Sequence, residues 1–203
     1  MSNLEKEKRK KLNLRTMVQI AMLGAIAVVL MMFEIPLGFA PSFYKLDFSE
    51  VPVLLGAFSM GPVAGVLIEL IKILLNLLIN GTYTAGVGEF ANFGIGCALV
   101  VPAGIIYKRK ASRTNAVIGL VIGTIVMAIV GGAFNAYVLI PLYSKAMMPM
   151  DVIISMGNQI NPNITGLTTF IMFAVVPFNL VKGVIVSIMT VLLYKYLRPF
   201  LHT

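Results

Sequence analysis

Long apolar runs separated by short polar segments make up most of this chain of 203 residues. A helix of about 20 apolar residues is long enough to cross the hydrocarbon core of a bilayer, and residues 14–33 match that length. The pattern predicts an all-α membrane protein with six transmembrane helices. We expect these helices at residues 14–33, 49–60, 62–80, 88–107, 114–140 and 167–197.

Residues 49–80 are too long for one crossing and short for two. Pro52 and the stretch Ser59–Met60–Gly61–Pro62 interrupt a continuous helix, because proline lacks a backbone donor and the Gly-Pro pair marks a turn. We therefore expect a short helix followed by a longer one. A short helix is tolerated at membrane depth where it is buried in protein or lines a cavity.

The composition supports a membrane protein. Of the residues, 59% are hydrophobic and 12% are charged, whereas soluble domains carry about a quarter charged residues. The surplus apolar surface is expected to face lipid. A formal net charge of +8 would raise nucleic acid as a partner of a soluble protein. Here most Lys and Arg residues lie in short segments that flank apolar runs and form no basic stripe, so no nucleic-acid partner is expected.

The positions of the positive charges predict the orientation of the chain. Lys and Arg gather in residues 6–15 and 108–113 and near the C-terminus, and basic loops stay on the cytoplasmic side of a membrane. Both termini are therefore predicted to be cytoplasmic. The resulting division is a basic tail at 1–13, a single six-helix membrane domain at 14–197 and a C-terminal tail at 198–203.

Two long loops fall on the outer side in this orientation. They connect the first helix to the second (residues 34–48) and the fifth to the sixth (residues 141–166), and the second of them has room for a short amphipathic helix. Long ordered loops are often functional. Their shared side suggests a binding site that opens to the exterior under a lid.

The sequence excludes several kinds of chemistry. Cys97 is the only cysteine and His202 the only histidine, so no disulfide within the chain and no histidine-based metal cluster is expected. A phosphate-binding loop of the G-x-x-x-x-G-K-[ST] type is missing, and so is a Ser–His pair. We therefore expect no enzyme activity, no metal and no cofactor.

Charged and amide side chains inside the apolar runs indicate an internal polar site. A charge at the centre of a membrane helix costs about 2.5–3.5 kcal/mol on insertion scales. Glu69 and Lys72 are three residues apart, so they can pair on one helix face. Lys182 has no carboxylate one turn away. The amides that could share a site with this lysine are those of Asn92, Asn135 and Asn179.

At these residues the sequence resembles a known family. The stretches that carry the resemblance are FYKLDFSEVPVLLGAFSMGPVAGVLIELIK, GEFANFGIGCALVVPAGIIY, FNAYVLIP and VPFNLVKG, and it extends over residues 14–195. They are similar to the riboflavin-specific S component, the substrate-binding membrane subunit of energy-coupling factor (ECF) transporters. The resemblance implies riboflavin uptake through a bacterial cell membrane, together with a transmembrane coupling subunit and two ATPase subunits.

The resemblance also implies roles for particular residues. Its substrate-binding domain has six helices, cytoplasmic termini and a vitamin site near the outer face. Asn135, Asn179 and Lys182 fall where the family binds the flavin ring. The lid loop over the site corresponds to Tyr44, Lys45, Leu46 and Asp47, and the small-residue motif that docks on the coupling subunit corresponds to Ala21 and Ala25.

The chemistry of a flavin fits these residues. The polar edge of its ring alternates carbonyl acceptors with an N–H donor, and an Asn amide offers both partners. Riboflavin would be bound as the transported substrate and not as a cofactor. The alternatives are an S component for another vitamin, an intramembrane enzyme, and a secondary transporter or channel that acts alone.

Overall fold

The computed structural model describes residues 14–82, 86–146 and 148–201. The predicted basic tail at 1–13, the centre of the 81–87 turn and His202 lie outside the described residues. Helices account for most of the described chain. They are α2 (Leu14–Met31), α3 (Glu50–Met60), α4 (Pro62–Asn80), α5 (Val87–Arg109), α6 (Arg113–Phe134), α7 (Ile140–Ala146), α8 (Met150–Ile160), α9 (Leu167–Phe170) and α10 (Val176–Leu201).

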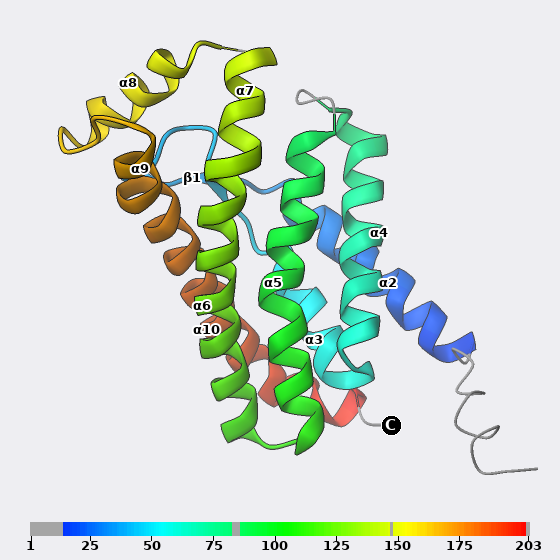
Figure 1. Cartoon of the computed structure of the whole chain (residues 1–203). Helices are drawn as coiled ribbons and strands as arrows, with labels where there is room; N and C mark the ends of the chain where they lie inside the picture. The colour runs from blue at the N-terminus through cyan, green and yellow to red at the C-terminus, as the bar shows by residue number, and fades with distance from the viewer. Residues whose placement is uncertain (1–13, 83–85, 147, 202–203) are drawn as a thin grey trace, which may run out of the picture.

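The long helices form one bundle (Figure 1). In this view α4, α5 and α6 run side by side, and α5 packs against both of its neighbours. The start of α2 and the end of α10 lie toward the same end of the bundle as the turn between α5 and α6. The segments that connect α2 to α3 and α7 to α9 lie toward the opposite end.

The predicted break between the second and third helices is confirmed. Gly61 adopts a φ of +103°, a backbone conformation that residues with a Cβ rarely reach, and Pro62 follows as the first residue of α4. The short helix α3 is buried over Glu50–Phe58. It therefore packs inside the protein and not against lipid.

Five helical segments within the described residues are long and apolar enough to cross a membrane. They are Leu14–Met31, Pro62–Asn80, Val87–Arg109, Arg113–Lys145 and Leu167–Lys195. Helix α3 has 11 residues, which at about 1.5 Å per residue covers only about half of the hydrocarbon core. The all-helical membrane fold follows directly, with α3 as a short buried member of the bundle.

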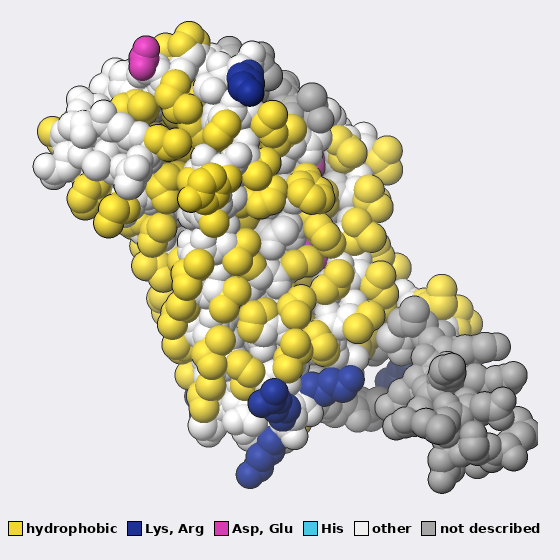
Figure 2. All heavy atoms as spheres, viewed as in Figure 1, with side chains coloured by type: hydrophobic (Ala, Val, Ile, Leu, Met, Phe, Trp, Pro, Cys, Tyr) yellow, Lys and Arg dark blue, Asp and Glu magenta, His cyan; other side chains and the backbone are white. Residues whose placement is uncertain are grey.

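Hydrophobic side chains cover the flank of the bundle that Figure 2 shows, and a group of Lys and Arg side chains lies at its lower end, near the turn between α5 and α6. Many large apolar residues are strongly exposed, including Val63, Leu78 and Ile129. A soluble protein rarely leaves so large an apolar surface open to water, so this surface suits contact with lipid.

The predicted end of the fifth helix at residue 140 is wrong. The helix continues from α6 through a π-turn, η1 (Asn135–Leu139), into α7. In a π-turn the backbone bonds span one residue more than in an α-helix, as in the bond from Ile140 N to Asn135 O. This wider turn comes directly before Pro141 and accommodates a residue that would otherwise break the helix.

The last helix contains the same kind of wider turn. A second π-turn, η2 (Ile171–Val175), ends with a bond from Val176 N to Ile171 O, and Pro177 follows. Helix α10 then continues to Leu201, beyond the predicted end at residue 197. Such π-turns are frequent at functional sites, and Asn135 and Asn179 lie in or just after them.

The segment from 34 to 48, predicted as a loop, contains a short antiparallel pair of strands. β1 (Ile35–Pro36) pairs with β2 (Lys45–Leu46), with Ile35 opposite Leu46. In the second long loop, the expected amphipathic helix is present as α8, where Ile153 and Gly157 are buried. Both segments lie at the end of the bundle opposite the α5–α6 turn (Figure 1).

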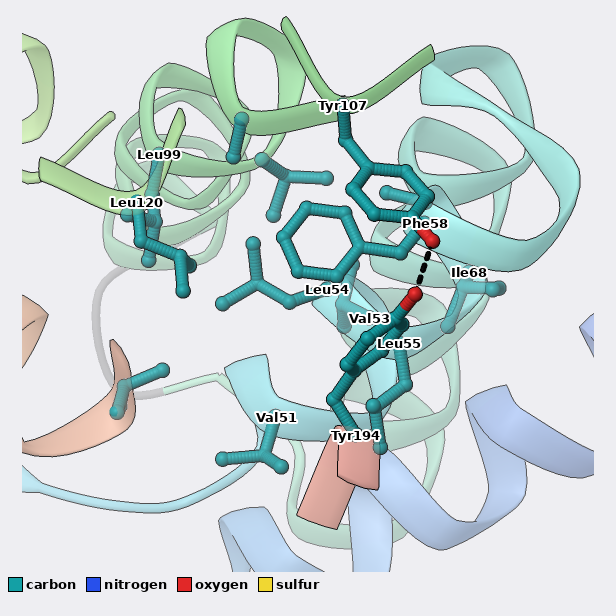
Figure 3. Packing of buried hydrophobic residues seen from close by; sticks show 14 of the residues in the cluster. Val51, Val53, Leu54, Leu55, Phe58, Ile68, Leu99, Tyr107, Leu120 and Tyr194 are labelled. Atoms are coloured by element: carbon teal, nitrogen blue, oxygen red, sulfur yellow. Dashed lines mark hydrogen bonds between the residues drawn. The ribbon is translucent and has the colours of Figure 1, made fainter. Parts of the chain in front are cut away.

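The main hydrophobic core lies toward the end of the bundle that holds the α5–α6 turn. Helix α3 supplies much of it, and Figure 3 shows Phe58 packed beside Tyr107 and Tyr194. The two tyrosine hydroxyls hydrogen-bond to each other. This end is therefore closed by side chains, which leaves the opposite end to hold a ligand.

Candidate functional site

A cavity of about 210 Å³ lies between the 34–48 segment and the helices α3, α5, α6 and α10. Its polar lining combines amides with charged groups, and its apolar lining combines aromatic with aliphatic side chains. The polar members include Asp47, Glu50, Asn92, Asn135, Asn179 and Lys182, and the aromatic members are Phe43, Tyr44, Tyr143 and Phe178. A mostly apolar pocket with a few convergent polar groups is the usual form of a small-molecule site.

Lys182 is neutralised by a residue far away in the chain. Its Nζ lies 2.8 Å from Asp47 Oδ2, and both side chains are less than a tenth exposed. Asp47 also accepts a 2.8 Å hydrogen bond from Ser49 N and another from the Ser49 hydroxyl. The ion pair therefore joins the 34–48 segment to α10 at the wall of the cavity.

These contacts lower the pKa of the loop carboxyl, Asp47. Burial alone would raise the pKa of Asp47, but the positive charges of Lys182 and Lys72 and the hydrogen bonds from Lys182 and Ser49 outweigh it. The pKa of Asp47 is lowered from 3.8 to about 2. Asp47 is thus ionised at neutral pH and holds a buried charge in place.

The two asparagines are held by their own helices. Asn135 Nδ2 donates to Gly131 O at 2.8 Å, and Asn179 Nδ2 donates to Val175 O at 2.9 Å. Both side chains are buried and line the cavity. Each amide has further hydrogen-bonding capacity beyond this one bond, so the pair is oriented in advance for a polar guest.

Tyr44 covers the cavity from the loop side. Its hydroxyl donates to Asn135 Oδ1 at 2.6 Å. Its ring lies 4.7 Å from that of Phe43 and 5.3 Å from that of Phe178, measured between centroids. Burial, followed by the neighbouring Tyr143, raises the pKa of the Tyr44 phenol. Tyr44 is therefore a neutral donor at physiological pH.

A second group of charges lies next to the cavity, which Glu50 lines. Lys72 Nζ is 2.7 Å from Glu50 Oε1 and 2.7 Å from Glu69 Oε1, and all three side chains are at most 1% exposed. The predicted pairing of Glu69 with Lys72 is thus confirmed. A Cβ at Gly96 would collide with the Glu69 carboxylate and lie 3.1 Å from Glu50 Oε1. Only a glycine there leaves room for this cluster.

The structure brings most of the predicted site residues together. Tyr44, Lys45, Asp47, Asn92, Asn135, Asn179 and Lys182 all line the cavity. Lys45 is the most exposed of the charged ones and pairs with Glu34 at 2.5 Å. Leu46 is different, because it is buried in the protein and lies outside the cavity lining. A direct contact of Leu46 with a ligand therefore has no support.

Ala21 and Ala25 lie on the exposed side of α2. Gly24 between them faces the other way, where a Cβ would lie 2.6 Å from Ile71 Cγ2 of α4. The small residues Ala21, Gly24 and Ala25 therefore face two different sides of α2. Gly24 allows close packing within the bundle, and the two alanines are exposed on the outside.

Sequence reasoning missed Glu50, Tyr143 and Phe178 as lining residues. Glu50 stands two residues before Pro52 at a helix start, where a carboxylate also suits the helix dipole, so its burial was not apparent. Phe178 could have been found, because it immediately precedes Asn179 and follows the proline of the second π-turn. Tyr143 falls in the segment predicted as a loop from residue 141 onward, whereas it lies in α7.

The comparisons with known proteins agree on one family. The family model described as "ECF transporter, substrate-specific component" matches residues 15–194. The riboflavin transporter RibU of Staphylococcus aureus (strain TCH60) is 41% identical over 198 residues, which cover 95% of this chain and 97% of that protein. The riboflavin transporter FmnP of Bacillus subtilis (strain 168) is 28% identical over 192 residues, covering 94% and 96%.

A solved structure supports the same assignment. It is described as "Structure and mechanism of the S component of a bacterial ECF transporter" and is similar with a TM-score of 0.71 and 40% identity. The match covers 93% of this chain and 98% of the solved one. The chain is thus a multi-pass membrane component of a transporter and not an enzyme, and it belongs to the family of ECF transporter substrate-specific components.

Proposed function

We propose that this protein is the riboflavin-binding S component of an ECF importer. The observation that carries the proposal is the cavity at one end of the bundle, where Asn135, Asn179 and Lys182 meet an aromatic lining. The relatives named above are riboflavin transporters and align over nearly the whole chain. Substrate identity rests on these two observations together.

The side chains suit a flavin ring. Amide groups of Asn135 and Asn179 can pair with the alternating carbonyl and N–H groups of its polar edge. The Lys182 ammonium can donate to a ring acceptor while its ion pair with Asp47 keeps it in place. The rings of Phe43, Tyr44 and Phe178 supply flat apolar walls, which favour an aromatic guest.

The cavity is smaller than most ligand sites. Its volume of about 210 Å³ falls below the roughly 300–1,000 Å³ typical of small-molecule pockets. Tyr44 fills part of the space and uses the acceptor of Asn135. Riboflavin would therefore enter as the 34–48 segment moves outward and Tyr44 releases Asn135, after which the segment closes over the vitamin as a lid.

The proposal includes the predicted topology. Six crossings, with α3 as the short second one, would leave both termini in the cytoplasm of a bacterial cell and the cavity open to the exterior. The chain carries no phosphate-binding loop, so uptake would require ATPase subunits and a transmembrane coupling subunit. Ala21 and Ala25 would form the surface that meets the coupling subunit, since small exposed residues let another helix approach closely.

The test of substrate identity is a titration of the detergent-purified protein with vitamins. Bound riboflavin should lose its fluorescence among the aromatic side chains, and riboflavin should raise the unfolding temperature. Thiamine and biotin should do neither. Stabilisation by one of these vitamins and not by riboflavin would overturn the assignment in favour of another S-component specificity. Vitamin uptake into liposomes by this chain alone would instead support an autonomous transporter.

A further inference from the structure

The buried charged side chains in and behind the lining of the cavity carry more negative than positive charge. Asp47, Glu50 and Glu69 are three carboxylates, whereas Lys72 and Lys182 are two ammonium groups. All five side chains are at least nine-tenths buried, and they form two separate groups: Lys72 pairs with Glu50 and Glu69, and Lys182 pairs with Asp47. Buried charges are costly unless they are paired and hydrogen-bonded. With every group ionised, the five groups carry one net negative charge, which a proton would neutralise or hydrogen-bond donors of a guest would solvate.

Glu50 is the carboxylate of the Lys72 group that a ligand in the cavity can contact. Its Oε1 accepts from Lys72 Nζ at 2.7 Å, while its Oε2 has no hydrogen-bond partner among the described residues. Glu50 is 1% exposed and lines the cavity. Glu69 also has an unpartnered oxygen, Oε2, but it does not line the cavity. Glu50 and Glu69 are therefore similar buried carboxylates, of which only Glu50 is accessible to a ligand, so Glu69 can serve as the control.

The cavity has two chemically different walls. The wall of η1 and α10 carries Asn135, Asn179 and Lys182, and an ammonium can only donate hydrogen bonds. The wall of α3 and α5 carries the carboxylate of Glu50 and, beside it, Gly96. An ionised carboxylate can only accept hydrogen bonds. A guest that spans the cavity must therefore present an acceptor to Lys182 on the first wall and donors to Glu50 on the second.

We infer that Glu50 is a further substrate-binding residue, which accepts hydrogen bonds from the hydroxyl groups of a polyol chain on the ligand. This inference rests on the proposed function. In riboflavin the ring supplies the acceptors for the first wall, and the ribityl chain supplies hydroxyl donors for Glu50. A hydroxyl paired with Glu50 Oε2 would satisfy a buried acceptor that the protein itself leaves open.

The test compares riboflavin with lumiflavin, which has the same ring and a methyl group in place of the ribityl chain. Affinities are measured by fluorescence titration for the wild type, Glu50→Gln and Glu69→Gln. Hydrogen bonds to charged groups are stronger than neutral ones. Glu50→Gln should therefore weaken riboflavin binding about tenfold or more and change lumiflavin binding less than about twofold. Glu69→Gln should leave both affinities within about twofold.

The outcomes separate this inference from the proposed function. Equal weakening of both ligands by Glu50→Gln, or equal effects of the two substitutions on riboflavin, would overturn a role in binding the chain. Failure of the wild type to bind either flavin would overturn the proposed function and the inference with it. The wild type alone gives a second check that needs no folded variant. It should bind riboflavin at least about tenfold more tightly than lumiflavin, and equal affinities would contradict the inference.

Discussion

Lys182 and Asp47 form a buried ion pair with 2.8 Å between Nζ and Oδ2, although 135 positions separate them in the chain. The pair fastens the 34–48 segment to α10 beside Asn179. One contact thus neutralises a lysine inside the bundle and sets the position of the segment that covers the cavity. The predictions below follow from this arrangement and its neighbours.

Removal of one partner of this pair should cost more stability than removal of both. Asp47→Ala and Lys182→Ala each leave an uncompensated buried charge, which typically costs about 3–5 kcal/mol. The double variant removes both charges and should be more stable than the less stable single variant. Thermal unfolding in detergent measures this. Additive losses in the double variant would show that the two side chains do not stabilise each other.

The stability of the protein should fall at low pH through Asp47. The pKa of this carboxyl is 3.8 when unperturbed and about 2 in the fold, so its ionisation stabilises the folded state above pH about 4. This contribution, about 2 kcal/mol, should disappear as the pH falls from about 4 to about 2. Unfolding temperatures over this range should therefore drop more for the wild type than for Asp47→Asn. Parallel curves would contradict the assignment.

Tyr44→Phe should speed the entry of riboflavin. The substitution removes the hydroxyl that occupies Asn135 Oδ1 and keeps the aromatic ring. A hydrogen bond of this kind contributes about 1 kcal/mol, so the association rate in stopped-flow fluorescence should rise about fivefold. Tyr137→Phe is the control, because Tyr137 lies nearby on η1 but is 83% exposed. An unchanged or slower association of Tyr44→Phe would show that this bond does not restrain the lid.

Larger side chains at Ala21 or Ala25 should block assembly without affecting the vitamin. Both residues are on the exposed side of α2, away from the cavity lining. Ala25→Leu should leave riboflavin affinity within about twofold and abolish copurification with the coupling subunit and its ATPases. Met22→Leu is the control, since Met22 is 60% exposed on the same helix. Normal assembly of Ala21→Leu and Ala25→Leu would place the docking surface elsewhere.

Local rules accounted for much of the fold. Apolar runs of sufficient length predicted the helices, and Gly61 with Pro62 predicted the break between α3 and α4, because these effects depend on neighbouring residues alone. The predicted end of the fifth helix at residue 140 was too early, because the helix continues through Pro141. A proline normally ends a helix, but the wider π-turn at Asn135–Leu139 accommodates it, and only tertiary packing reveals such a turn.

The site was predicted less completely for a related reason. The lack of a carboxylate one turn from Lys182 marked it as unusual, but its partner Asp47 lies on another element and could not be found from helix spacing. Glu50 was overlooked because burial, and not its position in the sequence, distinguishes it. The predicted pairing of Glu69 with Lys72 succeeded because both residues lie on one helix face, yet Glu50 as a third member required the packing of α3 against α4.

The most direct test of the central claim is the riboflavin affinity of Lys182→Ala, measured by fluorescence titration beside the wild type and Lys145→Ala. Lys145 is exposed and lies outside the cavity lining. The Asp47→Ala/Lys182→Ala variant, in which no uncompensated charge remains from the pair, serves as a second measurement. We predict that both variants lacking Lys182 bind riboflavin at least about tenfold more weakly, while Lys145→Ala binds as the wild type does. Wild-type affinity in a folded variant without Lys182 would contradict the account.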